Sequence, residues 1–142
     1  MKKAVTMMVA GVITSFSFAQ KIQEKDVPTT VKTSFNKTYP TAKEVKWDKE
    51  GNNYEASFDA NEIDNSVLFD ATGNEVETEV EIELNQLPSG VLEYVKTHYS
   101  NQKVKEAAKI TDAKGAITYE TELKGMDVLF DSNGKFIKEM KD

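Results

Sequence analysis

The hydrophobic positions of this chain follow the same pattern twice. In each copy, apolar residues first recur at helical spacing and then alternate with polar residues, as in half-buried strands. The helical stretches begin at Val27-Pro28 and Leu87-Pro88, and each copy later reaches Leu-Phe-Asp-x-x-Gly, at residues 68–73 and 129–134. Matching anchors at both ends of a segment are hard to produce by chance. We therefore interpret the chain as a tandem duplication of one supersecondary unit.

The alternating stretches predict four strands in each copy. The clearest of them lie at residues 45–48, 54–59, 67–69 and 76–83 in the first copy and at 104–110, 117–123 and 128–130 in the second. Short turns at Gly51, Gly73, Gly115 and Gly134 make sequential strands neighbours in the sheet. The predicted fold class is α+β, a tandem duplication of an α-β4 unit. Its antiparallel sheet has the helices packed on one face, because one helix per four strands covers only one face.

The first residues are typical of a secretory signal peptide. Lys2 and Lys3 precede an apolar stretch, residues 4–18, that is too short to span a bilayer, and Ala19 is a small residue suited to cleavage before Gln20. We expect residues 1–19 to be the signal, 20–84 the first repeat and 85–142 the second, with 20–142 forming one compact domain. The predicted location is periplasmic or secreted, without membrane insertion after signal cleavage.

Charge and composition narrow the classes of partner. The net charge is −6, and the mature chain would carry −8 because Lys2 and Lys3 leave with the signal. Such a chain repels phosphate backbones, so nucleic acid is not expected as a partner. The chain has no Cys, so its stability has to come from packing without disulfides. No cofactor is implied.

Three motifs have a chemical and a structural interpretation. The Asp70 and Asp131 loops resemble calcium loops in composition but lack EF-hand spacing, so turn chemistry is favoured and cation binding remains the alternative function. His98 has no nucleophile or further metal ligand beside it in the sequence, which favours a surface position at a helix end. The acidic row at residues 77–83 is interpreted as a solvated strand face.

The apolar pattern of the third strand in each copy allows for a binding surface on the sheet. Both parities are apolar in Val-Leu-Phe, at residues 67–69 and 128–130. If the leucines face the helices, the phenylalanines stand on the open face, where aromatic rings anchor protein interfaces and acids form a polar rim. The opposite parity buries the two rings. The candidate partner-binding residues are Trp47, Glu55, Phe69, Glu120 and Phe130.

These repeated motifs, behind a signal peptide, resemble the periplasmic PepSY-like proteins of the Bacteroidetes. That group shares its fold with beta-lactamase-inhibitor protein, and the resemblance spans about residues 22 to 142. It implies a curved sheet whose open face grips a protein, although this chain lacks the disulfides of the inhibitor. We therefore expect a secreted, non-enzymatic protein-binding module that restrains a peptidase or another envelope enzyme. Its partner is an unidentified envelope or secreted protein.

Overall fold

The computed structural model describes residues 19–141, which form two α-helices and nine antiparallel strands. The expected signal peptide, residues 1–19, lies outside the described residues apart from Ala19. The chain groups into two compact units, which divide between Thr78 and Glu79, inside a strand. We call them unit 1 and unit 2. This division follows packing, so the repeat boundary between residues 84 and 85 stays a prediction.

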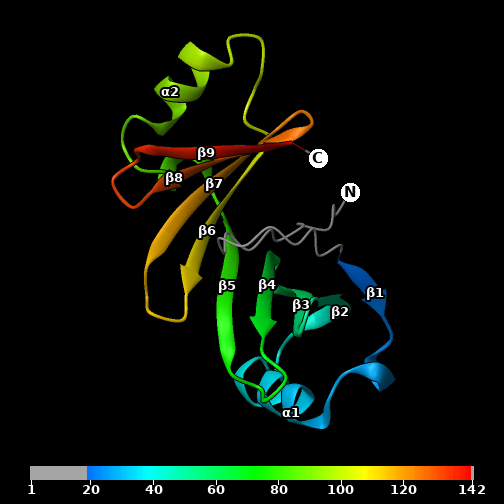
Figure 1. Cartoon of the computed structure of the whole chain (residues 1–142). Helices are drawn as coiled ribbons and strands as arrows, with labels where there is room; N and C mark the ends of the chain where they lie inside the picture. Colours follow the sequence, from blue (N-terminus) through cyan, green and yellow to red (C-terminus); the bar gives the residue numbers. More distant parts are fainter. Residues whose placement is uncertain (1–18, 142) are drawn as a thin grey trace. The chain divides into compact units, whose positions relative to one another are not determined.

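Unit 1 has one α-helix and strands whose hydrogen-bonded neighbours follow chain order (Figure 1). Its elements are β1 (Gln20–Ile22), the 3-10 helix η1 (Glu24–Asp26), α1 (Thr29–Thr38), β2 (Lys43–Glu50), β3 (Asn53–Ala60), β4 (Ile63–Phe69) and β5 (Glu75–Ile82). The last of these, β5, continues into unit 2.

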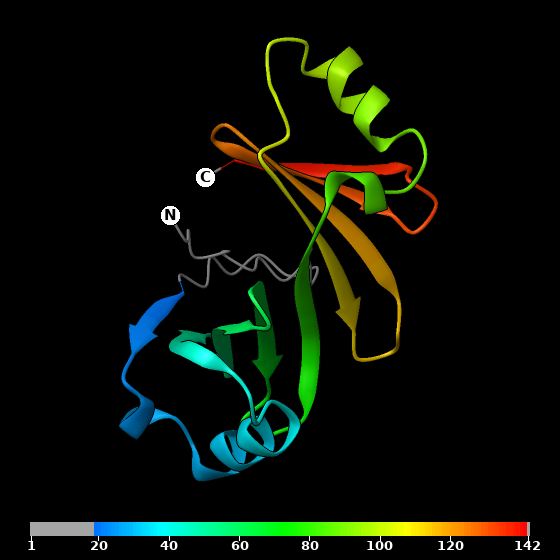
Figure 2. The same ribbon diagram turned by 180° about the vertical axis from the view of Figure 1, so that it is seen from behind.

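Unit 2 repeats this order, with α2 lying along one side of its strands (Figure 2). Its elements are the 3-10 helix η2 (Leu84–Gln86), α2 (Val91–His98), β6 (Glu106–Asp112), β7 (Ile117–Leu123), β8 (Met126–Asp131) and β9 (Phe136–Lys141). The predicted helix followed by four strands, present twice, is confirmed.

Strand β5 belongs to both copies of the repeat. Its first half follows the Asp-x-x-Gly turn, as β9 does in unit 2. Its end leads into η2, as β1 leads into η1, and η2 starts 60 residues after η1 (84 − 24 = 60). The sequence pattern predicted neither β1 nor the two 3-10 helices, because three-residue elements are too short to show a period.

The core of unit 1 lies between α1 and the sheet and is built around Phe35. The Phe35 ring packs edge-on against Trp47, Phe58 and Phe69, with ring centroids 5.3, 5.1 and 6.4 Å apart. This arrangement suits the ring quadrupoles and adds to the free energy gained by burying each ring. The buried residues of this core are Val27, Val31, Phe35, Trp47, Ala56, Phe58, Val67 and Phe69.

The core of unit 2 occupies the corresponding place beneath α2. Here the helix contributes Tyr94, which packs edge-on against Phe130 at 5.5 Å and stacks on Phe136 at 5.2 Å between ring centroids. The buried residues of this core are Val91, Val95, Leu123, Val128 and Phe130. Each α-helix thus buries two apolar residues four positions apart, Val31 and Phe35 in unit 1 and Val91 and Val95 in unit 2.

The Asp-x-x-Gly turns are held by their own side chains. Asp70 Oδ1 accepts hydrogen bonds from the backbone N–H groups of Thr72 and Asn74, at 2.9 and 3.0 Å, and Asp70 Oδ2 accepts one from Asn74 Nδ2 at 2.9 Å. Hydrogen bonds to the charged form, chiefly from Thr72 and Asn74, hold the pKa of Asp70 well below its usual range. Asp131 Oδ1 likewise accepts from the backbone N–H of Asn133 at 2.9 Å. The predicted turn chemistry is confirmed.

The same turns pack tightly against the helical segments. Gly73 has φ +91°, and a Cβ atom there would lie 2.7 Å from Ser34 Oγ and 2.8 Å from the Thr30 carbonyl oxygen. Gly134 has φ +81°, and its Cβ would lie 2.8 Å from the Ser89 carbonyl oxygen. Glycine is therefore required at both positions by backbone conformation and by space.

Candidate functional site

Each unit has a sheet face turned away from its α-helix, which we call the helix-free face. Strand pairing assigns its residues, since directly paired residues on antiparallel strands point to the same side. In unit 1, Glu55 pairs with Asp48 on β2 and with Leu68 on β4, whereas the adjacent Ala56 lies in the core under α1. The register places these acids on the helix-free face: Asp48, Glu50, Glu55, Asp59 and Asp64.

Unit 2 presents an equally acidic helix-free face. Glu120 pairs with Ala108 on β6 and with Leu129 on β8, while Thr121 and Val128 pair on the side of α2. The acids on this face are Glu106, Glu120, Glu122, Asp127 and Asp131. Among the described residues, the register adds fewer lysines than acids: Lys21, Lys43 and Lys46 in unit 1 and Lys138 in unit 2.

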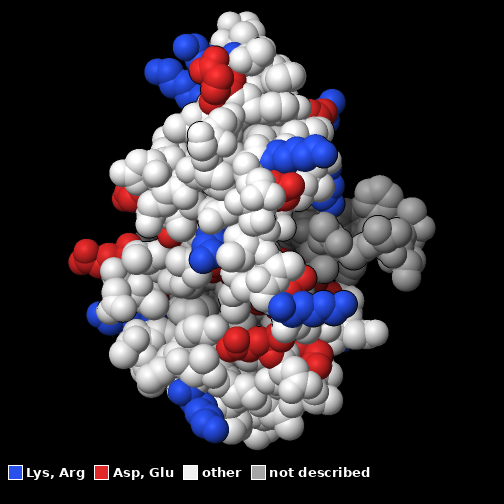
Figure 3. All heavy atoms as spheres, turned by 90° about the vertical axis from the view of Figure 1, so that its left-hand side faces the viewer, with Lys and Arg blue, Asp and Glu red and all other residues white. Residues whose placement is uncertain are grey.

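The acidity of these faces comes from strand register. In the space-filling view of Figure 3, acidic and basic side chains are scattered among uncharged residues on the side that is drawn. On the helix-free faces, alternation along each strand and pairing across strands bring carboxylates together. These faces are therefore the best candidates for a charged contact surface.

Of the two orientations that the sequence left open for the third strand, the structure has the one that buries the phenylalanines. Phe69 and Phe130 are 0% exposed and lie in the helix-side cores, together with Val67 and Val128. Leu68 and Leu129 occupy the helix-free faces and are also buried. Alternation gave no guidance, because both sides of these strands are buried and apolar.

A signal for the correct orientation is present in the hairpin before this strand. Asn61 and Glu62 both have positive φ and form the turn that pairs Ala60 with Ile63. That register pairs Tyr54 with Phe69, so the two rings share a face with the apolar residues of β3. The turn length could thus have fixed the side on which Phe69 lies.

Trp47 also belongs to a core. It is 6% exposed, pairs with Ala56, and packs against Phe35 beneath α1. Of the five candidate partner-binding residues, the structure thus brings Glu55 and Glu120 to helix-free faces and places Trp47, Phe69 and Phe130 behind them. The role of all five in partner binding stays a prediction.

Glu55 has an unusual environment for a carboxyl group. It is 2% exposed, and its Oε1 atom has no hydrogen-bond partner within the described chain. Burial, followed by the nearby charge of Glu50, raises the pKa of Glu55 to about 8, and the Asp48 charge adds to the rise. Ser66 counteracts it through a hydrogen bond to the carboxyl. Glu55 is therefore largely protonated at neutral pH.

Not all of the acidic row on β5 is solvated as expected. Glu79 is 2% exposed, whereas Glu83 is exposed and caps η2, its backbone N–H donating to Gln86 Oε1 at 2.8 Å. Strand β5 has strands on both sides and is not an edge strand, so the row does not protect a sheet edge. The expectation of exposure is wrong for Glu79.

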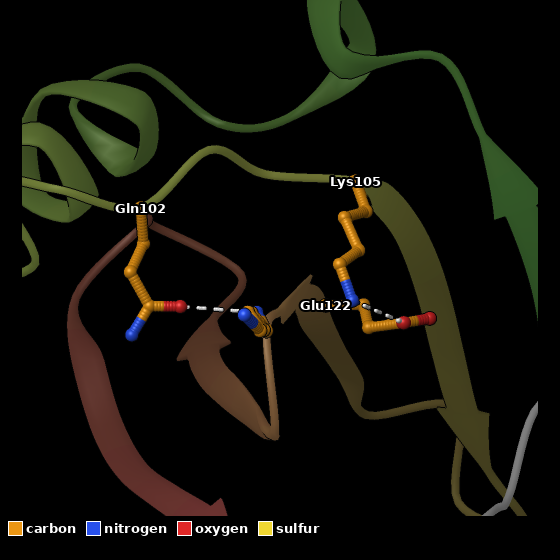
Figure 4. Close-up of polar contacts among 4 residues, drawn as sticks. Gln102, Lys105 and Glu122 are labelled. Carbon is orange, nitrogen blue, oxygen red and sulfur yellow. Dashed lines mark hydrogen bonds and ion pairs between the residues drawn. The ribbon is translucent and has the colours of Figure 1, made fainter.

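Polar contacts fasten the segment that leads from α2 to β6 (Figure 4). Gln102 Oε1 accepts a hydrogen bond from the backbone N–H of Lys124 at 3.0 Å, at the turn between β7 and β8. Lys105 Nζ lies 3.6 Å from Glu122 Oε1. Since both side chains of this ion pair are partly exposed, it contributes little to stability, but it brings a positive charge to one acid of the helix-free face.

His98 lies on the surface at the end of α2. Its ring stacks on Tyr94, with centroids 3.9 Å apart, and its Nδ1 atom lies 3.0 Å from the Tyr94 carbonyl oxygen. These contacts agree with the structural interpretation of this histidine. Within residues 19–141, no group of three or more His, Cys, Asp or Glu side chains has an arrangement that could hold a metal ion. The calcium alternative stays a prediction.

None of the helices in residues 19–141 combines the length and apolar character needed to cross a membrane.

The sequence matches one protein family twice. The family model described as "Putative beta-lactamase-inhibitor-like, PepSY-like" matches residues 17–74 and 53–138. The two matches together cover most of the chain and agree with the duplication. None of the curated proteins compared with the chain matches it.

Solved structures share this fold. A "putative periplasmic" protein from Bacteroides eggerthii is 20% identical, with a TM-score of 0.71 over 81% of this chain and 88% of its own. A DUF2874 family protein from Bacteroides uniformis is 24% identical, with a TM-score of 0.69 over 80% and 88%. A BLIP-like protein from Bacteroides fragilis is 27% identical, with a TM-score of 0.58 over 80% and 86%. The arrangement of helices and strands is therefore shared with these proteins.

Proposed function

Because the chain belongs to the PepSY-like family, we propose that it is a non-enzymatic protein-binding module of the cell envelope, periplasmic or secreted. Its working surfaces are the helix-free faces, and its partner is a peptidase or another envelope enzyme that it restrains. The similarity to a BLIP-like protein supports a binding role.

The acidic register of the helix-free faces carries this proposal. Each face brings together five carboxyl groups by strand pairing, and the net charge of the chain has the same sign. A surface with this charge attracts basic protein surfaces and speeds their encounter, an effect that salt weakens. The partner should therefore present a cluster of Lys or Arg side chains to the module.

Two of the five candidate residues lie on this surface, although their own side chains are buried and the partly exposed acids around them would make the direct contacts. Glu55 and Glu120 hold equivalent strand positions on the two helix-free faces, each paired with a buried leucine on the next strand. Trp47, Phe69 and Phe130 pack behind these faces and hold the strands in place. We assign them a supporting role, because a ring without exposed area makes no direct contact.

The test uses two variants that each remove three negative charges. The face variant combines Asp48→Asn, Asp64→Asn and Glu122→Gln, all partly exposed on helix-free faces. The control variant combines Glu24→Gln, Asp26→Asn and Glu93→Gln, which are exposed on η1 and α2. Each is immobilised and exposed to a periplasmic extract, and the captured proteins are compared with those held by the unmodified chain.

We expect the unmodified chain and the control variant to capture the same basic envelope protein, and the face variant to lose it. The captured enzyme should lose activity when the unmodified module is added. Equal capture by the face variant and the control variant would refute the proposed surface.

A further inference from the structure

A buried pair of carboxyl groups sets unit 1 apart from unit 2. Glu50 and Glu55 lie on the helix-free face of unit 1, on the paired strands β2 and β3, within hydrogen-bonding reach of one another. Glu55 is almost completely buried and Glu50 is partly buried. Two carboxylates this close repel each other strongly when both are ionised and buried, so one of them retains a proton.

The surroundings of the two carboxyl groups decide which of them holds the shared proton. Burial raises the pKa of both groups, but the hydrogen bond between them lowers the pKa of Glu50 and raises that of Glu55. The Glu55 hydroxyl therefore donates and the Glu50 carboxylate accepts. Because Glu55 has the more buried position, the proton resides there at neutral pH.

The other charged groups on this face do not neutralise the Glu50–Glu55 pair, so the pair still retains a proton. From β2, Asp48 pairs with Glu55 and raises its pKa, whereas Lys46 pairs with Ser57 and is exposed. From β1, the exposed Lys21 pairs with Asp48. The exposed Lys43 of β2 pairs with Asp59 of β3. The further polar or charged residues that the register puts on this face of β3 and β4 are Asn53, Ser57, Asp64 and Ser66. The neighbours of Glu55 are thus predominantly acidic.

Unit 2 has the same strand geometry without the pair. Glu120 holds the position of Glu55, but Ala108 stands where unit 1 has Asp48, and Ile110 stands where it has Glu50. The two halves of the duplication therefore provide an internal comparison. At the positions that hold Glu50 and Asp48 in unit 1, unit 2 thus has apolar residues.

We propose that the Glu50–Glu55 pair is a pH-sensitive device built into the β2–β3 hairpin of unit 1. With its proton in place, the pair packs as a neutral acid hydrogen-bonded to a carboxylate. When the proton leaves, two buried negative charges face each other and the hairpin is weakened. The pair acts on the stability of the fold, whatever partner the protein binds.

The sign of the pH dependence follows from proton linkage. The folded chain binds the Glu55 proton more tightly than the unfolded chain, in which a glutamate has its ordinary pKa of 4.5. The stabilisation is complete below about pH 4.5, decreases as the pH rises, and is lost above about pH 8. The mature protein should therefore melt at a lower temperature in mildly alkaline than in mildly acidic buffer.

Thermal melting between pH 5.5 and pH 9 tests the device with three variants of the mature protein. The unmodified protein should melt about 5 °C or more lower at pH 9 than at pH 5.5. Glu55→Gln should abolish most of this difference, and Glu50→Gln should move the midpoint of the change to lower pH. The matched control Glu120→Gln leaves the pair intact and should keep the pH dependence. A dependence that persists in Glu55→Gln would overturn the proposal.

A direct titration keeps the proposal testable if Glu55→Gln fails to fold. The side-chain carboxyl of Glu55 can be followed by carbon-13 NMR in the unmodified protein. A midpoint near 8 is expected for the buried pair, and one below about 5.5, typical of a solvated glutamate, would contradict it.

Discussion

Units 1 and 2 share a framework but differ in what fills it. The Asp-x-x-Gly turn, the glycine pressed against the helical segment and the tyrosine at the helix end occur in both. The helix-free faces and the cores differ in residue type. The duplication therefore keeps residues that determine backbone conformation and varies those that decide chemistry, so function should be sought on the faces.

The tyrosines at the helix ends illustrate the shared framework. The Tyr99 hydroxyl donates to Glu139 Oε2 at 2.7 Å, and burial together with Glu139 raises the pKa of Tyr99 to about 12. The pKa of Tyr39 is also raised, first by burial and then by the neighbouring carboxylate of Glu75. Each tyrosine thus ties its helix to the last strand of its copy, although a different position on that strand supplies the carboxylate.

The largest expected contrast between the units concerns their cores. Phe35 lies at the centre of four aromatic contacts, whereas the equivalent helical position in unit 2 is Val95. Phe35→Ala should lower the free energy of unfolding by about 3–5 kcal/mol, and Val95→Ala by about 2 kcal/mol, because the lost area and the cavity are smaller.

Denaturant unfolding measures both effects. Trp47 fluorescence reports on unit 1, because the only tryptophan of the chain packs against Phe35, and far-ultraviolet circular dichroism follows the whole chain. Equal losses from the two substitutions would show that the aromatic cluster gives unit 1 no additional stability.

The glycine turns provide a smaller and more symmetrical test. Gly73→Ala and Gly134→Ala should each destabilise by more than the roughly 1–2 kcal/mol of a left-handed alanine, since their Cβ atoms would clash with backbone oxygens. Gly115→Ala is the matched control, with φ +83° and no atom within 4 Å of its Cβ. If all three substitutions cost the same in thermal melting, the close packing of turn and helix would be unimportant for stability.

Calcium should have the smallest effect. The carboxyl oxygens of Asp70 already accept hydrogen bonds within their own turn, and Asp131 Oδ1 does the same. Millimolar calcium should therefore leave the melting temperature of a chain of residues 20–142 unchanged. A rise that chelator reverses would show preferential binding to the folded chain and would favour the cation-binding alternative.

Much of the framework could be predicted from the sequence, because its residues have strong local preferences. Helical spacing at Val31 and Phe35, alternation in β3 and the glycine turns each act over a few residues. The face of the third strand could not be predicted from alternation, since Leu68 and Phe69 are both fully buried. Register, set by the turn at Asn61 and Glu62, decides that question.

The candidate site was predictable only in part for the same reason. Glu55 and Glu120 were selected as a polar rim around aromatic anchors, and they lie on the predicted sheet face without those anchors. Their burial, and the pairing of Glu55 with Glu50, depend on neighbours across the strands. A single sequence shows which residues alternate along a strand more clearly than it shows which strands pair with each other.

The affinity of a captured envelope enzyme for the two charge-matched variants tests the central claim most directly. Binding to the control variant should equal binding to the unmodified chain and weaken as salt is added. Binding to the Asp48→Asn, Asp64→Asn, Glu122→Gln variant should fall at least tenfold, a loss of about 1.4 kcal/mol. Unchanged affinity of this variant would contradict the assignment of the helix-free faces as the binding surface.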